Sequence, residues 1–279
     1  MFNISPKRQL WLLFGFYCFS NALGSFVVLT VQKFSSHQVA KLALSTIPIF
    51  SFLVPAFIAY KLFANKSLFN YWGLSIPFRK KSFFITVSIM GCCIILMNWL
   101  LQVNKSIPLF QWMKADETET QARLMQYLEM DNSWQLLLNL VIFSVVPSFC
   151  EEVFFRGTMQ SIFCRYLPKV WLAIFLTAFV FSLLHFQFAG FLPRLLAGVV
   201  LGGIFCITGS LWLSMVSHTL YNGFLIILNY ANQHNQVDMV HLERQLLHPF
   251  LVVLAAALIL LLFCQLRKES FKTRKLYSQ

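Results

Sequence analysis

Long apolar runs are the feature that most constrains this chain. A helix of about 20 residues crosses a ~30 Å hydrocarbon core, and a backbone in lipid must satisfy its hydrogen bonds within the helix itself. Short polar stretches separate the apolar runs. The apolar runs occupy residues 10–31, 42–63, 82–103, 134–149, 171–188, 195–208, 211–230 and 249–266. The pattern predicts an all-α fold, a polytopic membrane helix bundle with about eight transmembrane helices.

The composition excludes an ordinary soluble domain. Apolar residues make up 58% of the 279 positions and charged residues 11%, whereas an average soluble domain has roughly half and a quarter. A soluble fold could not bury so much apolar surface. We therefore predict a single membrane domain over residues 1–279. Since the sequence contains no visible repeat, an inverted-repeat transporter has no positive support.

The net charge of +12 fits a lipid partner better than a nucleic acid. The sequence carries no recognition motif for RNA or DNA, so we expect no nucleic acid and a lipid bilayer instead. Basic residues gather beside the apolar runs, and the positive-inside rule then predicts that both termini are cytoplasmic. The clearest group is a basic cytoplasmic tail over residues 267–279, which an anionic leaflet would attract and which contains Arg267, Lys268, Lys272, Arg274 and Lys275.

The most polar stretch lies between the third and fourth runs, over residues 114–131. Its spacing places Leu124, Met125 and Leu128 on one helical stripe. This predicts either an amphipathic helix on the membrane surface or a solvated loop helix. The two alternatives differ in whether the stripe contacts lipid.

Three groups of polar side chains interrupt the apolar pattern. Ionisable groups at membrane depth cost several kcal/mol unless they are paired or solvated, so in helix bundles they indicate function. Pro147 precedes the first group and is expected to bend its helix. The groups are the stretches Glu151 to Gly157, Phe181 to His185, and His218 to Asn222.

Helical spacing suggests how these side chains are arranged. Residues four apart share one face, so Glu152 can pair with Arg156, and His218 and Asn222 can point into the same space. Glu151 lies about 100° around the helix from Glu152 and is expected to face elsewhere. One carboxylate would then be held by the arginine while the other stays free for chemistry.

These residue types could hydrolyse a bond in a water-filled cavity. A carboxylate and an imidazole around one water can remove its proton as it attacks a carbonyl carbon. A second histidine and an asparagine amide can supply donors for the developing oxyanion. Structural alternatives remain for each part: an ion pair between Glu152 and Arg156, a packing role for His185, and hydrogen bonds between helices from His218 and Asn222.

The three groups also carry a family resemblance. The order EExxFRG, FSxxH and HxxxN over residues 134–229 resembles the CPBP family, the CAAX protease and bacteriocin-processing (Abi) intramembrane proteases. The resemblance implies an intramembrane endopeptidase with its catalytic core in residues 134–230. It implies that Glu151 and His185 activate the attacking water, that Glu152 and Arg156 support them, and that His218 and Asn222 form the oxyanion site.

The resemblance leaves the cofactor open. Members are often called metalloendopeptidases, and one glutamate with two histidines meets the three-ligand rule for catalytic zinc. Glu151, His185 and His218 are then the candidate ligands if a divalent metal is used. Because the chain lacks HExxH, we favour a water without a metal, and the expected cofactor is none or a divalent metal such as zinc.

The substrate is expected to be a membrane-associated protein or peptide. CAAX enzymes remove a C-terminal tripeptide from prenylated proteins, but the EExxFRG form resembles bacterial members, and bacteria generally lack prenylated CAAX proteins. The expected location is a bacterial inner (plasma) membrane. The alternatives are a non-catalytic membrane scaffold or bacteriocin self-immunity protein and, less favoured, a transporter that uses buried Glu and His.

Overall fold

The computed structural model describes residues 4–76 and 79–277, and the secondary structure within this part of the chain is entirely helical. Each apolar run forms a helix, but the fifth helix ends at Leu183, so the predicted end of this span at residue 188 is wrong. Continuous long helices are α1 (Pro6–Phe34), α6 (Lys80–Lys105), α12 (Phe191–Thr208), α13 (Leu211–Gln233) and α15 (Pro249–Tyr277). Shorter elements between the long helices are α5 (Leu68–Trp72), α7 (Gln111–Tyr127), α11 (Val170–Leu183), the 3₁₀ turn η4 (Phe188–Gly190) and α14 (Met239–Leu246).

Two further spans are composite helices with π-helical segments. The first joins α2 (His37–Leu44), α3 (Thr46–Pro48), η1 (Ile49–Leu53) and α4 (Val54–Phe63). The second joins α8 (Ser133–Leu140), η2 (Val141–Val145), α9 (Val146–Glu152), η3 (Val153–Gln160) and α10 (Ser161–Tyr166). Each interior proline borders a π segment, with Pro48 before η1, Pro55 at the start of α4 and Pro147 at the start of α9. Proline has no backbone N–H, so one helical hydrogen bond is missing, and a π-helical segment changes the local hydrogen-bond pattern to accommodate this loss.

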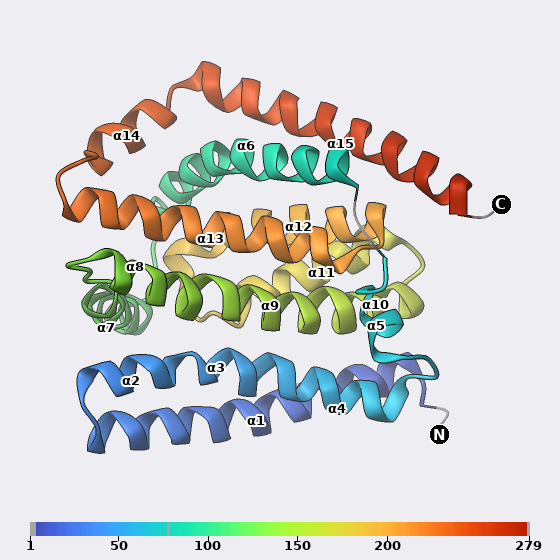
Figure 1. Ribbon diagram of the computed structural model, residues 1–279, viewed down its shortest axis with the longest axis horizontal. Coiled ribbons are helices and arrows are strands. Elements are labelled where there is room, and N and C mark those ends of the chain that lie inside the picture. Colours follow the sequence, from blue (N-terminus) through green and yellow to red (C-terminus); the bar gives the residue numbers. More distant parts are fainter. Residues whose placement is uncertain (1–3, 77–78, 278–279) are drawn as a thin grey trace.

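The predicted membrane bundle is confirmed. Within the described residues, seven helices are long and apolar enough to cross a membrane, and the 14-residue α11 is a shorter apolar helix. These eight helices alternate in direction, and the chain starts and finishes at the same end of the bundle (Figure 1). The predicted boundary of the fourth span is wrong, because the helix does not end at Phe149 but continues to Tyr166.

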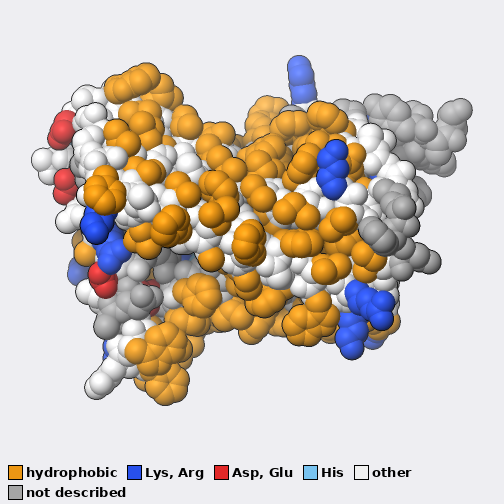
Figure 2. All heavy atoms as spheres, turned by 90° about the horizontal axis from the view of Figure 1, so that it is seen from below, with side chains coloured by type: hydrophobic (Ala, Val, Ile, Leu, Met, Phe, Trp, Pro, Cys, Tyr) orange, Lys and Arg blue, Asp and Glu red, His pale blue; other side chains and the backbone are white. Residues whose placement is uncertain are grey.

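The helices pack in layers (Figure 1). One layer holds α1 and the composite helix α2 to α4, a central group holds α8 to α13, and α6 packs with α15 on the far side. Many large apolar side chains remain exposed outside the two buried clusters, including Phe19 at 76% and Val253 at 70%. Figure 2 shows an apolar face with most of its charged side chains toward the two ends. An apolar band between charged ends is the surface of an integral membrane protein.

The helix expected in the polar stretch 114–131 exists as α7. It runs across the direction of the apolar helices and is seen nearly end-on in Figure 1. Leu124 and Leu128 are partly buried, whereas Met125 is 47% exposed. One side of α7 therefore packs on the protein. At the other end of the chain, α15 extends through most of the predicted basic tail, where Lys272, Arg274 and Lys275 have side chains outside the described set.

Two glycines on α1 allow a controlled test of the packing between the first two spans. A Cβ at Gly24 would lie 2.6 Å from Cβ of Phe50, while a Cβ at Gly15 would meet no atom within 4 Å. We expect Gly24→Leu to destabilise the protein by about 1–3 kcal/mol through overpacking. Gly15→Leu should change little. The melting temperatures of both variants in detergent measure this, and equal values would contradict the close approach of α1 to η1.

Candidate active site

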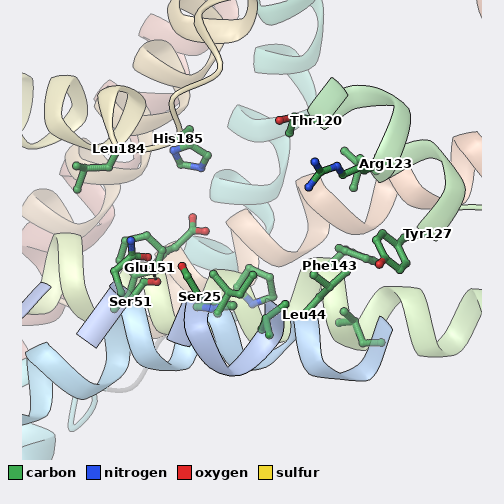
Figure 3. Close-up of a pocket in the computed structure, with 18 of the residues that line it drawn as sticks. Ser25, Leu44, Ser51, Thr120, Arg123, Tyr127, Phe143, Glu151, Leu184 and His185 are labelled. Carbon is green, nitrogen blue, oxygen red and sulfur yellow. Dashed lines mark hydrogen bonds between the residues drawn. The ribbon is translucent and has the colours of Figure 1, made fainter. Parts of the chain in front are cut away.

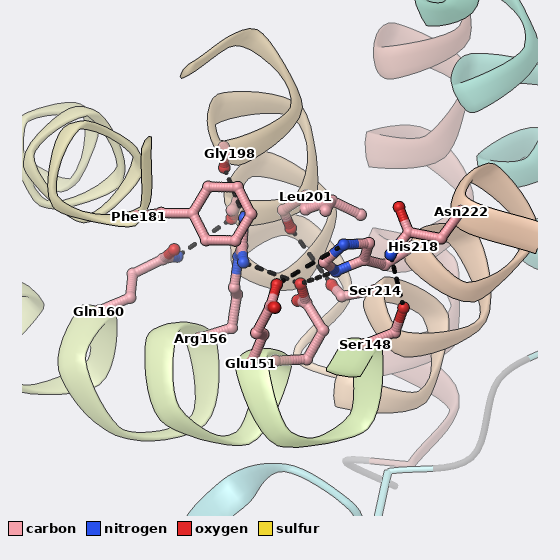
Figure 4. Close-up of polar contacts among 12 residues, drawn as sticks. Ser148, Glu151, Arg156, Gln160, Phe181, Gly198, Leu201, Ser214, His218 and Asn222 are labelled. Atoms are coloured by element: carbon pink, nitrogen blue, oxygen red, sulfur yellow. Dashed lines mark hydrogen bonds and ion pairs between the residues drawn. The ribbon is translucent and has the colours of Figure 1, made fainter. Parts of the chain in front are cut away.

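A buried ion pair joins Glu152 to Arg156. Nη1 of Arg156 donates to Oε1 of Glu152 at 2.8 Å, and both side chains are fully buried. Nη2 of the same guanidinium donates to the carbonyl oxygen of Gly198 on α12 at 3.1 Å. The pair therefore links the helix that carries it to a neighbouring helix (Figure 4).

His218 connects both carboxylates. Its Nδ1 lies 2.9 Å from Oε1 of Glu152, and its Nε2 lies 3.8 Å from Oε2 of Glu151. Although the two carboxylates face different sides of the helix, one imidazole lies between them, with Nδ1 toward Glu152 and Nε2 toward Glu151. Since a carboxylate paired with arginine can only accept, the contact with Glu152 places a proton on Nδ1 of His218.

His185 follows α11, where the chain leaves the helix. Its Nδ1 lies 2.7 Å from the carbonyl oxygen of Phe181. Because a carbonyl only accepts, this contact places the proton on Nδ1 and leaves Nε2 of the neutral ring as an acceptor. His185 therefore has the tautomer that a base requires.

Phe181 lies between the three groups. Its ring centroid is 4.8 Å from the ring of His185, 6.0 Å from the ring of His218 and 4.9 Å from Cζ of Arg156. The side chain is 2% exposed. A guanidinium over an aromatic face is an attractive contact. Phe181 thus fixes the spacing between the histidines and the ion pair.

Asn222 lies one turn after His218 on α13. Its Nδ2 donates to Oγ of Ser148 on α9 at 3.3 Å. Figure 4 shows Asn222 and His218 side by side above the helix of Glu151. The amide is therefore held close to the carboxylates by a hydroxyl that the sequence motifs do not include.

A cavity of about 610 Å³ reaches this cluster. Glu151 and His185 both line it, together with residues of α1, the composite helix α2 to α4 and α7 (Figure 3). Glu151 is 8% exposed, whereas Glu152 is fully buried. The cavity thus reaches one carboxylate and leaves the other in the protein interior.

One comparison with known proteins gave a match. Residues 133–224 match the family model described as type II CAAX prenyl endopeptidase, Rce1-like. The matched segment is similar to that family and makes up 92 of the 279 residues. The earlier resemblance to CAAX proteases is thereby confirmed, and the family supports a membrane-embedded protease. The comparisons with curated proteins and with solved structures gave no match.

The Rce1-like segment contains the candidate metal ligands, but they do not form a metal centre as arranged. Across the described residues, no three His, Cys, Asp or Glu side chains are grouped so that they could hold a metal ion. Nδ1 of His185 faces a carbonyl and Nδ1 of His218 faces Glu152, which leaves Nε2 of each ring for other partners. Within the described residues, the separation of the three side chains therefore does not match a three-ligand metal site.

Sequence reasoning missed Arg194. Within the Rce1-like segment, Arg156 and Gln160 donate to the carbonyl oxygens of Gly198 and Gly202, each 42 positions later. The same offset brings Arg194 to the level of Glu152, and its guanidinium interacts electrostatically with Glu151. The predicted span began at residue 195 and left Arg194 in a linker. The helix begins at Phe191 instead, so a second guanidinium lies near the acidic pair.

Breaking the buried pair should cost far more than breaking an exposed one. Arg156→Met leaves Glu152 buried without its counter-ion, which typically costs about 3–5 kcal/mol. Arg123 forms an ion pair of the same i,i+4 spacing with Glu119, but both side chains are more than half exposed. Arg123→Gln should therefore have a small effect. Similar melting temperatures for the two variants would contradict the structural role of Arg156.

Proposed function

We propose that this chain is an intramembrane endopeptidase that hydrolyses a peptide bond of a membrane-associated protein or peptide. The observation that carries the proposal is the cavity that both Glu151 and His185 line. A carboxylate and an imidazole beside an accessible cavity can bind and deprotonate a water molecule. The similarity of residues 133–224 to a protease family supports the same reaction class.

In the proposed reaction, Glu151 acts as the general base. A water held by Glu151 and by Nε2 of His185 loses a proton to Glu151 while its oxygen bonds to the carbonyl carbon. The carbonyl π electrons move to the oxygen and form a tetrahedral oxyanion. Glu151 then returns the proton to the amide nitrogen as the C–N bond breaks, which gives a carboxylic acid and an amine.

His218 and Asn222 are the proposed donors for the oxyanion. Nε2 of His218 is 3.8 Å from Oε2 of Glu151, too long for a hydrogen bond but suitable for two groups that bind one small molecule between them. In its imidazolium form, His218 donates from Nε2. Nδ2 of Asn222 adds an amide donor, and loss of one such donor typically costs about 10²–10³ in kcat.

Glu152 and Arg156 are the proposed support for His218. The carboxylate of Glu152 contacts both Nδ1 of His218 and Nη1 of Arg156 through its Oε1 atom. This arrangement orients the imidazole ring and fixes its tautomer. Both side chains are fully buried, which suits a role in positioning rather than contact with the substrate.

The proposed location is a bacterial inner membrane with both termini in the cytoplasm. The basic residues Arg79 and Lys81 form ion pairs with Glu269. They lie near the ends of α6 and α15, at the end of the bundle where the chain also starts (Figure 1). Basic residues at this end favour the cytoplasmic side by the positive-inside rule.

Replacement of the proposed base and of the proposed water-binding histidine tests the function. Glu151→Gln and His185→Ala should each lower the cleavage rate by about 10²–10⁴, because each removes a proton-transfer or water-binding group. Comparative peptidomics of membranes from a deletion strain, complemented with each variant, measures the cleavage products and identifies the substrate.

The matched control is Glu129→Gln, which removes an exposed carboxylate outside the cavity and should leave the products unchanged. Full complementation by Glu151→Gln with the same peptide profile as the wild type would refute the protease and favour a scaffold or self-immunity protein.

A further inference from the structure

The cavity at Glu151 has an acidic and a basic side chain in its wall. Among the described residues that line it, Glu151 is the only acidic one and Arg123 the only Lys or Arg. Figure 3 shows Arg123 on α7, directed into the space across from Glu151. A ligand that fills this cavity therefore meets a carboxylate at one part of its wall and a guanidinium at another.

The remaining wall suits a peptide with apolar side chains. Val28 and Leu29 of α1, Ile47 of α3 and Phe143 of η2 line it beside a few hydroxyl and amide groups such as Ser51. Cavities of about 300–1,000 Å³ with mostly apolar walls and few polar groups are typical ligand sites. The polar groups then decide the orientation of the ligand.

Arg123 is held over the cavity because α7 is fastened on both sides of it. Toward the start of α7, both carboxylate oxygens of Glu117 accept from the backbone N–H of Ala189 at 3.0 Å. At its end, the hydroxyl of Tyr127 accepts from Nε2 of Gln32 on α1 at 3.2 Å. These contacts tie α7 to the first span and to the segment that follows His185.

The guanidinium of Arg123 can bind a further anion. Its Nη2 donates to Oε1 of Glu119, while a guanidinium carries five N–H donors in a planar fork. Arginine binds carboxylates in two-bonded geometry more readily than lysine does. The contact with Glu119 thus leaves donors for a second carboxylate.

We propose that Arg123 binds a carboxylate of the substrate while the scissile peptide bond lies at Glu151. The inference rests on the proposed function and specifies the substrate further. The substrate is an apolar peptide segment that bears a carboxylate at a set distance from the cleaved bond. This carboxylate is either the free C-terminus of the substrate or an acidic side chain.

Binding of three labelled peptides to full-length Glu151→Gln protein in detergent micelles tests the proposal without catalysis. The probes are an apolar hexapeptide with a free C-terminus, the same peptide as its C-terminal amide, and the amide with one internal Asp. We expect at least one carboxylate form to bind about tenfold more tightly than the amide, the size of one charge-assisted pair. Which of the two does so identifies the source of the carboxylate.

Adding Arg123→Gln to this protein should remove the preference, and Arg123→Lys should keep part of it. Lys114→Gln is the matched control, since it removes an exposed positive charge from α7 outside the cavity, and should keep the full preference. Equal binding of all three peptides, binding of none, or a preference that survives Arg123→Gln would overturn the proposal. If such a result were found while Glu151→Gln abolished cleavage, the proposed protease function would stand and only the role of Arg123 would be refuted. If the carboxylate preference were found while Glu151→Gln left cleavage unchanged, only the proposed catalysis would be refuted.

Discussion

The buried contact between Glu152 and Arg156 is the interaction on which the rest of the site depends. Two opposite charges with no exposed surface cost desolvation energy that only close geometry and further hydrogen bonds can offset. Those bonds come from other helices, with Gly198 of α12 on the guanidinium and His218 of α13 on the carboxylate. The pair therefore gains its partners on the neighbouring helices only when the three helices have the correct register.

Small residues make that register possible. A Cβ at Gly198 would lie 2.7 Å from Cβ of Ala178, and one at Gly202 would lie 2.7 Å from Oε1 of Gln160. Glycines four apart let membrane helices approach until backbone carbonyls accept from side chains of a neighbour. The carbonyl oxygens that receive Arg156 and Gln160 are those of these two glycines. Close helix packing and the hydrogen bonds from Arg156 and Gln160 thus occur at the same two glycines.

The sequence predicts contacts within one helix better than contacts between helices. The pairing of Glu152 with Arg156 follows from i,i+4 spacing alone, and the apolar runs suffice for the bundle. The reach of His218 to Glu151 depends on how α13 is rotated against α9, which no spacing encodes. Arg194 was missed because η4 and the first turn of α12 start earlier than hydropathy suggests. The contribution of α1 and α7 to the cavity lies outside the motifs altogether.

The different surroundings of two adjacent glutamates explain how one motif serves both structure and chemistry. Neighbours on a helix are separated by about 100°, and here that rotation directs Glu152 into the bundle and Glu151 to the cavity. The imidazole of His218 can lie near both carboxylates because its two ring nitrogens point in different directions. His218 thus lies between the buried carboxylate, 2.9 Å from Nδ1, and the accessible carboxylate, 3.8 Å from Nε2. Oε1 of Glu152 contacts both Arg156 and His218. The buried ion pair therefore helps to set the orientation of the His218 ring beside Glu151.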